Sequence, residues 1–293
     1  MLILLMAVNL QTIKEIRNYL VTELGEIYSP SEAGSIINIV LKHVLRKDNL
    51  YLFSRPEDPI PEKNIDKLLD ISNQLKTGKP VQYIVGETDF YGYRIIVNGN
   101  VLIPRPETEE LVDLVIKENP AYTGHVLDIG TGSGCIAVAL AGNLPQAAVT
   151  AIDNSSPALR TASVNARNND VNIKFLDFDI MSGLIPETGT AEIIVSNPPY
   201  VLNSEKSSMH KNILDFEPAA ALFVPDNEPL KFYKAILDIA IELLLKGGRI
   251  YFEINESKGK SMADLLGYYS YSDIRVIKDM NGKDRIIKGI KNE

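Results

Sequence analysis

The chain has 293 residues, of which 45% are hydrophobic, and this predicts one large domain and one small one. Its net charge of -8 disfavours, without excluding, a protein that grips a phosphate backbone, because such proteins usually present a basic face. Cys135 is the only cysteine, which excludes an internal disulfide and a cysteine cluster for zinc, and the three histidines are scattered. We therefore expect no metal site and a reducing, cytoplasmic compartment.

Residues 1–8 are apolar but short, and they lack a basic segment before them. A transmembrane helix needs roughly 20 apolar residues, so we predict neither a membrane span nor a signal peptide. We interpret this segment as an extension of the first helix or as an artefact of the start site.

Residues 1–80 are predicted to form a small helical domain. Apolar residues recur at helical spacing over 13–24, 36–45 and 65–75, and a proline-rich stretch separates the second and third of these helices. Basic and acidic residues are equal in number here, so the domain is neutral and the whole acidic excess lies downstream.

Residues 81–104 are predicted to form a linker that contains a β-hairpin. The stretch 83–97 is rich in β-branched and aromatic residues, and Gly86 and Gly92 interrupt it. The remainder, 105–293, is predicted to be the second domain.

Helix and strand patterns alternate through 105–293. Helices are expected at 108–117, 135–142, 157–168 and 230–245, and strands at 125–128, 148–153, 173–176, 192–196 and 249–254. This alternation predicts an α/β fold with a mostly parallel sheet and helices on both faces. An Asn281-Gly282 turn between 274–277 and 285–290 predicts a closing antiparallel hairpin.

A glycine-rich loop follows the strand 125–128, and the carboxyl ends of strands are where open α/β sheets bind ligands. The loop holds an acid and then a G-x-G-x-G pattern: Asp128, Gly130, Thr131, Gly132, Ser133 and Gly134. Glycines let a ligand approach the backbone closely. The alternatives are an ordinary glycine-rich connection and a dinucleotide-binding loop, whose fingerprint would place glycine where Cys135 stands.

Two further acids follow neighbouring strands. Asp153 ends the strand 148–153, where a carboxylate can accept hydrogen bonds from both hydroxyls of a ribose. A solvated acid or a helix cap is the alternative at this position. Asp179 and Ile180 follow the next strand and are predicted to line an adenine pocket.

The turn Asn197-Pro198-Pro199-Tyr200 follows the apolar strand 192–196. Its prolines fix φ and stiffen the turn. The Asn197 side-chain oxygen and the Pro198 carbonyl can each accept one N–H of a planar NH2 group, while Tyr200 packs against that group; these bonds strengthen as the nitrogen becomes positive. The acceptor is either a side-chain amide or the amine of adenine in a nucleic acid, unless the segment is only a rigid surface turn.

Nearly the whole chain resembles the PrmC/HemK family of protein-(glutamine-N5) methyltransferases. The likeness lies in the loop and turn above, in Asp153, and in the segments 82–92, 102–109, 216–218 and 279–285. It implies a class I, Rossmann-like methyltransferase sheet with a C-terminal antiparallel hairpin. It also implies S-adenosylmethionine as methyl donor, S-adenosylhomocysteine as product, and the glutamine of the Gly-Gly-Gln motif in class 1 peptide chain release factors as acceptor.

The resemblance assigns further roles. It implies that residues 1–80 dock the release factor, that the segment with Arg105 and Glu107 lies beside the substrate, and that Asn197 also neighbours the cofactor. It implies a monomer that needs no direct nucleic-acid contact. The chain departs from the family at Ile180, where some members have a large aromatic residue. It departs again after Glu253, whose role is therefore left open, and a degenerate fold that only binds remains a further alternative.

Overall fold

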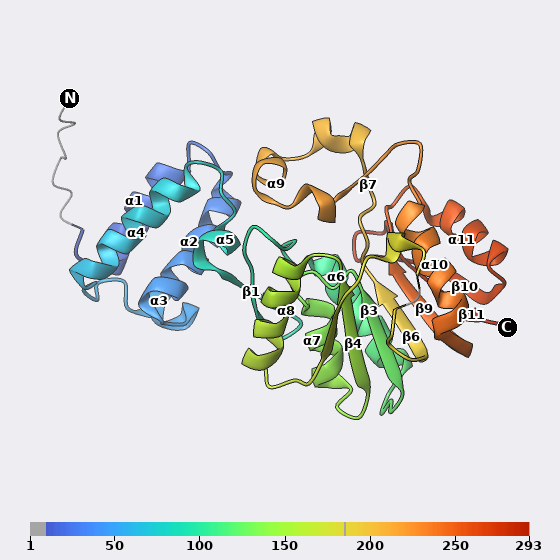
Figure 1. Ribbon diagram of the computed structural model, residues 1–293. Coiled ribbons are helices and arrows are strands. Elements are labelled where there is room, and N and C mark those ends of the chain that lie inside the picture. Colours follow the sequence, from blue (N-terminus) through green and yellow to red (C-terminus); the bar gives the residue numbers. More distant parts are fainter. Residues whose placement is uncertain (1–9, 185, 293) are drawn as a thin grey trace. The chain divides into compact units, whose positions relative to one another are not determined.

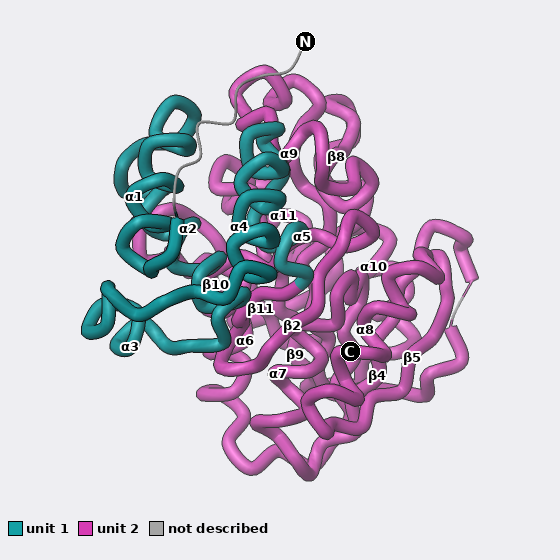
Figure 2. Tube along the Cα trace, turned by 90° about the vertical axis from the view of Figure 1, so that its left-hand side faces the viewer, with its two compact units in different colours: residues 1–86 teal, residues 87–293 magenta. Residues whose placement is uncertain are grey.

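The computed structural model describes residues 10–184 and 186–292 (Figure 1). The predicted behaviour of residues 1–8 therefore lies outside the described residues. The chain divides into two compact units, Met1–Gly86 and Glu87–Glu293 (Figure 2). Within the described ranges, every helix is too short or too polar to span a membrane.

The first unit is helical. Its helices are α1 (Ile13–Leu24), α2 (Pro30–Leu45), α3 (Asn49–Ser54), α4 (Glu62–Leu75) and α5 (Val81–Val85). Helix α1 begins with a capping box, in which the Thr12 hydroxyl accepts from the Glu15 N–H and the Glu15 carboxylate accepts from the Thr12 N–H. Its residues at helical spacing are buried in one core with those of α2, α4 and α5.

Two of these helices were not expected. The short α3 carries little apolar periodicity, and its Leu50 and Phe53 are exposed. Helix α5 occupies residues for which the sequence predicted the start of a β-hairpin, so that prediction was wrong for 83–85. Val81 and Val85 lie one helical turn apart and both are buried in this core, and their burial outweighs the β propensity of valine.

The second unit opens with the expected hairpin, now bounded as β1 (Glu87–Phe90) and β2 (Tyr93–Ile96). Its described part contains a seven-stranded sheet in the order β10-β11-β9-β6-β3-β4-β5. The strands are β3 (His125–Ile129), β4 (Ala148–Asp153), β5 (Lys174–Asp177), β6 (Ala191–Ser196), β9 (Leu244–Glu253), β10 (Tyr271–Lys278) and β11 (Asp284–Lys291). Strands β5, β4, β3, β6 and β9 run parallel, and β11 and β10 complete an antiparallel edge. The predicted α/β fold with its closing hairpin is confirmed.

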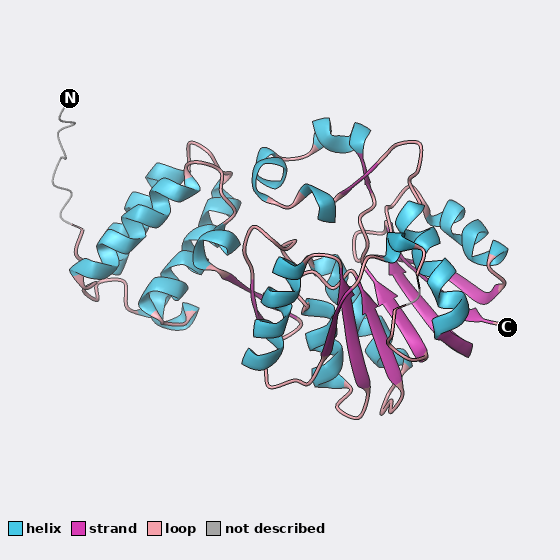
Figure 3. Cartoon of the chain, in the orientation of Figure 1, coloured by secondary structure: helices cyan, strands magenta, loops and turns pink. Residues whose placement is uncertain are grey.

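Helices cover both faces of this sheet (Figure 3). They are α6 (Pro106–Glu118), α7 (Cys135–Asn143), α8 (Ser156–Asn168), α10 (Lys231–Leu243) and α11 (Gly259–Tyr268). Helices α10 and α11 share one core with β3, β6 and β9. Helix α7 contacts α6 and also α8. Helix α11 was not expected from the sequence.

The strand order places the carboxyl ends of three strands around one crevice. Strand β3 pairs in parallel with both β4 and β6. The chain adds β4 and β5 on one side of β3 and then returns to add β6 and β9 on the other side, so the order of the strands reverses at β3. Such a reversal leaves a crevice for a ligand between the flanking loops.

An excursion that the sequence pattern did not predict stands between β6 and α10. It contains the short parallel pair β7 (Val201–Leu202) and β8 (Phe223–Val224), the helix α9 (Lys211–Phe216), and 3-10 turns at Asn203–Ser208 and Ala219–Ala221. Neither α9 nor the two 3-10 turns contain a buried residue, so their sequences need no apolar periodicity that could have indicated them.

Candidate active site

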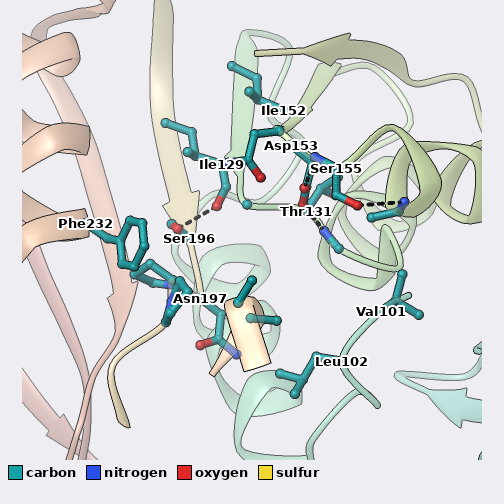
Figure 4. Close-up of a pocket in the computed structure, with 18 of the residues that line it drawn as sticks. Val101, Leu102, Ile129, Thr131, Ile152, Asp153, Ser155, Ser196, Asn197 and Phe232 are labelled. Carbon is teal, nitrogen blue, oxygen red and sulfur yellow. Dashed lines mark hydrogen bonds between the residues drawn. The ribbon is translucent and has the colours of Figure 1, made fainter. Parts of the chain in front are cut away.

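A cavity of about 390 Å³ lies at the carboxyl ends of β3, β4 and β6 (Figure 4). Its volume lies within the range of small-molecule pockets in proteins. The predicted site residues that line it are Arg105, Gly130, Thr131, Gly132, Ser133, Asp153, Asp179, Ile180, Asn197, Pro198 and Pro199. Four predicted residues are not part of the lining: Glu107, Asp128, Gly134 and Tyr200.

The glycine-rich loop is held by close backbone packing. Gly132 has φ +55°, a conformation that favours glycine, and its N–H donates to Asp153 Oδ2 at 2.8 Å. Gly134 serves a different purpose, because a Cβ there would lie 2.9 Å from the Cβ of Ala162 on α8. Gly134 thus lets α7 pack against α8 behind the cavity instead of facing a ligand.

Asp128 lies beneath the loop and is completely buried. Its Oδ2 accepts from the Thr131 hydroxyl at 2.6 Å, whereas its Oδ1 has no hydrogen-bond partner among the described residues. Burial raises the pKa of this carboxyl to about 7, against the lowering effects of the Thr131 hydroxyl and of the nearby Ala137 N–H, which does not come within hydrogen-bond geometry of Oδ1. A buried oxygen without a partner is costly, and this one stands next to the loop that lines the cavity.

Asp153 presents its carboxylate at the end of β4. Oδ2 accepts from the Gly132 N–H, and Oδ1 accepts from the Ser155 N–H at 2.9 Å. Burial raises the pKa of Asp153, while these N–H groups lower it. The N-cap of α8 is Ser155, whose hydroxyl accepts from the Ala158 N–H, so the helix cap does not depend on the Asp153 side chain. Each Asp153 oxygen has a second lone pair for a hydroxyl donor.

Asp179 and Ile180 follow β5 on the same side. The Asp179 carboxylate accepts from the Met181 N–H at 2.9 Å and thereby caps the 3-10 turn Ile180–Ser182. Ile180 packs against the core under α10 and also lines the cavity. Apolar lining also comes from three residues that the sequence did not indicate, Phe178, Phe223 and Phe232. Figure 4 shows the Phe232 ring beside the turn that follows β6.

The turn after β6 is anchored at its first residues. The Ser196 hydroxyl donates to the Ile129 carbonyl at 2.5 Å, which joins the ends of β6 and β3. Asn197 Nδ2 donates to Thr108 Oγ1 at 3.1 Å, and Asn197 Oδ1 accepts nothing from the described residues. Pro198 is buried and also lines the cavity.

A buried carboxylate stands behind this turn. Glu253, at the end of β9, accepts from Thr108 Oγ1 at 2.7 Å and from the Tyr200 hydroxyl at 2.9 Å. Burial raises the pKa of Glu253. Burial, together with the charge of Glu253, also holds the pKa of Tyr200 well above its usual value. The Tyr200 hydroxyl is thus a donor to Glu253, and this residue supports the turn from behind the cavity wall.

Arg105 lines the cavity and pairs with a glutamate of the excursion. Its guanidinium donates to Glu217 Oε1 at 2.5 Å, and Glu217 Oε2 accepts from the Ile103 N–H at 3.2 Å. The Glu217 side chain is only 1% exposed, whereas that of Arg105 is 31% exposed. The sequence singled out 216–218 as a family-like segment without assigning this contact. Glu107 stays outside the lining, and its charge raises the pKa of Glu253.

The residues of this cavity fit a nucleoside-containing cofactor. They supply a carboxylate with free lone pairs at a strand end, a loop without side-chain bulk at Gly130 and Gly132, and apolar walls. Among the described residues, His, Cys, Asp and Glu form no group that could hold a metal ion.

Comparisons with known proteins cover nearly the whole chain. Residues 108–222 match the family model of the methyltransferase small domain, and residues 15–86 match that of the PrmC N-terminal domain. A release factor glutamine methyltransferase of Flavobacterium psychrophilum is 45% identical over 284 residues, which are 94% of this chain and 98% of that one. A protein of the same name from Bacteroides thetaiotaomicron is 44% identical over 269 residues, covering 92% and 96%.

Solved structures support the fold. A methyltransferase from Pyrococcus furiosus superposes with a TM-score of 0.52 at 18% identity, covering 80% of this chain and 100% of that chain. At this identity the likeness shows a shared fold.

Proposed function

We propose, because the chain belongs to the family of release factor glutamine methyltransferases, that it methylates the side-chain amide nitrogen, N5, of the glutamine in the Gly-Gly-Gln motif of class 1 release factors. Membership in that family makes the chain a methyltransferase. The observation that carries a planar NH2 group as acceptor is the Asn197 side chain, which lines the cavity with its Nδ2 bonded to Thr108 and its Oδ1 available. The choice of a release-factor glutamine over the adenine amine rests on the family.

The residues at the ends of β3, β4 and β5 would hold the cofactor. Gly130 and Gly132 would let its amino-acid end approach the loop above Asp128. The free lone pairs of Asp153 suit the two ribose hydroxyls, and Asp179 and Ile180 suit the adenine. S-adenosylmethionine, when bound, supplies an electrophilic methyl group and leaves as S-adenosylhomocysteine.

The residues at the end of β6 would hold the acceptor. An amide nitrogen is a poor nucleophile because its lone pair is delocalised into the carbonyl group. Asn197 Oδ1 and the Pro198 carbonyl can each accept one N–H of the glutamine NH2, which orients the nitrogen. Both bonds strengthen as that nitrogen becomes positive, so they favour the transition state over the ground state. Positioning of this kind can supply much of a rate acceleration.

The remaining parts of the proposal concern partners and location. The match of residues 15–86 to the PrmC N-terminal domain supports a docking role for the first unit towards the release factor. We further propose a monomer that acts in the cytoplasm without a direct nucleic-acid partner. These statements rest on the family and on the acidic charge of the chain.

The test uses labelled S-adenosylmethionine and a folded release factor, with the Gly-Gly-Gln glutamine intact or replaced by alanine. DNA and RNA are offered in parallel reactions. We expect label on the intact factor alone. Label on nucleic acid, or equal label on both factors, would refute the glutamine assignment and favour the adenine amine or another side chain as acceptor.

A further inference from the structure

Three side chains from distant parts of the second unit form a continuous hydrogen-bond chain behind the cavity wall. Asn197 Nδ2 donates to Thr108 Oγ1 at 3.1 Å, and Thr108 Oγ1 donates to Glu253 Oε2 at 2.7 Å. Asn197 follows β6, Thr108 lies in the first turn of α6, and Glu253 ends β9. Of the three, only Asn197 and Thr108 belong to the cavity lining.

The chemistry of these groups allows one direction for the chain. An ionised carboxylate only accepts, so the single hydroxyl proton of Thr108 must go to Glu253. The Thr108 oxygen can then only accept, and the NH2 end of the Asn197 amide is the end that can donate to it. If the amide were turned round, its oxygen would face the Thr108 oxygen with no proton between them. The Glu253 carboxylate, two hydrogen bonds away, thus determines which way the NH2 and oxygen ends of the Asn197 amide point.

Three groups around Glu253 favour its ionised, accepting form and oppose the effect of burial. The Tyr200 hydroxyl donates to its Oε1 at 2.9 Å, and Arg285 Nη1 donates to that hydroxyl at 3.5 Å. Arg285 is itself held by Asp279 at 3.2 Å. Burial raises the pKa of Glu253, whereas Thr108, Tyr200 and Arg285 lower it and the charge of Glu107 raises it.

The direction of the amide decides which chemical group the cavity wall can recognise. The acceptor nitrogen of a glutamine carries only N–H donors, so its partner must be an oxygen. With Asn197 reversed, one NH2 group would face another, and the contact would be repulsive. A reversed amide would instead suit a carboxylate.

We propose that Thr108 and Glu253 are positioning residues, which direct Asn197 Oδ1 to the substrate and thereby select an amide over a carboxylate. This inference rests on the proposed function, since it concerns how the same site recognises a glutamine side chain. It assigns Glu253, whose place in the sequence suggested no role, to substrate selection through two hydrogen bonds.

The test compares Thr108→Val with Thr108→Ser in the full chain. Valine keeps the shape of threonine without the hydroxyl, whereas serine keeps the hydroxyl. For Thr108→Val we expect kcat on the intact release factor to fall by about 10- to 100-fold, as for the loss of a preorganised polar contact. We expect Thr108→Ser to remain close to the wild type. Cofactor affinity, measured by calorimetry, should be nearly the same in all three proteins.

A second readout reports the direction of the amide itself. A release factor with glutamate in place of the Gly-Gly-Gln glutamine is added as an inhibitor. It should inhibit Thr108→Val more strongly, relative to the binding of the intact factor, than it inhibits the wild type or Thr108→Ser, because the freed amide can turn and donate. A merely structural role for Thr108 would not change this ratio.

The outcomes separate the two proposals. If the wild type labels no release factor, the proposed function fails before any variant is compared. If the wild type is active and Thr108→Val matches Thr108→Ser in kcat and in the inhibition ratio, the positioning role is refuted. Should Thr108→Val fail to fold, Thr108→Ala removes the same hydroxyl without adding bulk, and the same expectations apply to it.

Discussion

The two sides of the cavity are built in different ways. On the side that we propose for the cofactor, at the ends of β3 and β4, the contacts link residues close in sequence. Thr131 is bonded to Asp128, 3 positions away, and Gly132 to Asp153, 21 positions away. On the side that we propose for the acceptor, at the end of β6, side chains from distant segments meet. Asn197 is bonded to Thr108 across 89 positions and Thr108 to Glu253 across 145.

This difference explains why one side can be recognised locally and the other cannot. A loop whose backbone does the binding must contain glycine at fixed spacings, and such a pattern is visible in a short stretch of sequence. A side-chain network needs only that its members meet in space. Removing members of each side should therefore produce separable effects, on cofactor affinity for one and on methyl transfer for the other.

The largest effect is expected from Asn197→Ala. It removes the acceptor that only the substrate uses, and we expect the rate of methyl transfer at saturating cofactor to fall by about 100- to 1000-fold. Cofactor affinity measured by calorimetry should change little. A loss of cofactor binding that matched the loss of rate would place Asn197 on the cofactor side and refute the separation of the two sides. Asn168→Ala, at an exposed position of α8, is the matched control and should behave as the wild type.

A smaller and opposite effect is expected from Asp153→Ala. Its carboxylate accepts from two backbone N–H groups and has lone pairs for two ribose hydroxyls, so we expect cofactor affinity to fall by about 10- to 100-fold. The rate should recover at high cofactor concentration. Asp177, which is paired with Asp153 in the register of β4 and β5 and does not line the cavity, is the control position. Unchanged affinity in Asp153→Ala would count against the ribose role.

The sequence predicted the local structure of the proposed cofactor side more fully than the contacts of the proposed acceptor side. Alternation of helices and strands was enough for the sheet, and the glycine pattern located the loop between β3 and α7. Periodicity could not show that Gly134 faces Ala162, because that contact depends on how α7 meets α8. It could not join Glu253 to Thr108 either, since each stands in a separate apolar or capping pattern that accounts for it locally.

The ion pair between Arg105 and Glu217 offers a milder test on the acceptor side. Glu217→Gln keeps the shape of the side chain and removes the charge that holds Arg105. Because Arg105 is partly exposed, the pair is worth roughly 1 kcal/mol, and we expect the KM for the release factor to rise about fivefold. Cofactor affinity should stay unchanged. An equal change in the KM for the release factor and in the dissociation constant of the cofactor would show that the excursion supports both sides of the cavity.

Asp128 provides the last comparison, because it acts on the cofactor side through stability. The pKa of its carboxyl is about 7 in the folded protein, above the ordinary value of 3.8, so the folded state favours the neutral carboxyl. The stabilisation linked to this proton is complete below the unfolded pKa and is lost as the pH rises through the folded pKa. Asp128→Asn has no such proton to lose, although its new NH2 group meets the same lack of partners.

The decisive quantity is therefore how the stability of the wild type relative to Asp128→Asn changes between two pH values. Which of the two proteins is more stable at either pH does not decide the question. Between about pH 5.5 and about pH 8.5 the wild type should lose about 2 kcal/mol relative to Asp128→Asn, which corresponds to roughly 4–8 °C in melting temperature. Thermal melts of both proteins without cofactor measure this shift, and the contributions of Asp153 and Glu253 largely cancel because both proteins contain them. A gap that stays constant with pH would mean that Asp128 is ionised throughout this range. In that case the unpaired Oδ1 already carries its charge in the protein without cofactor, and the loop would present a negative group to whatever binds beside it.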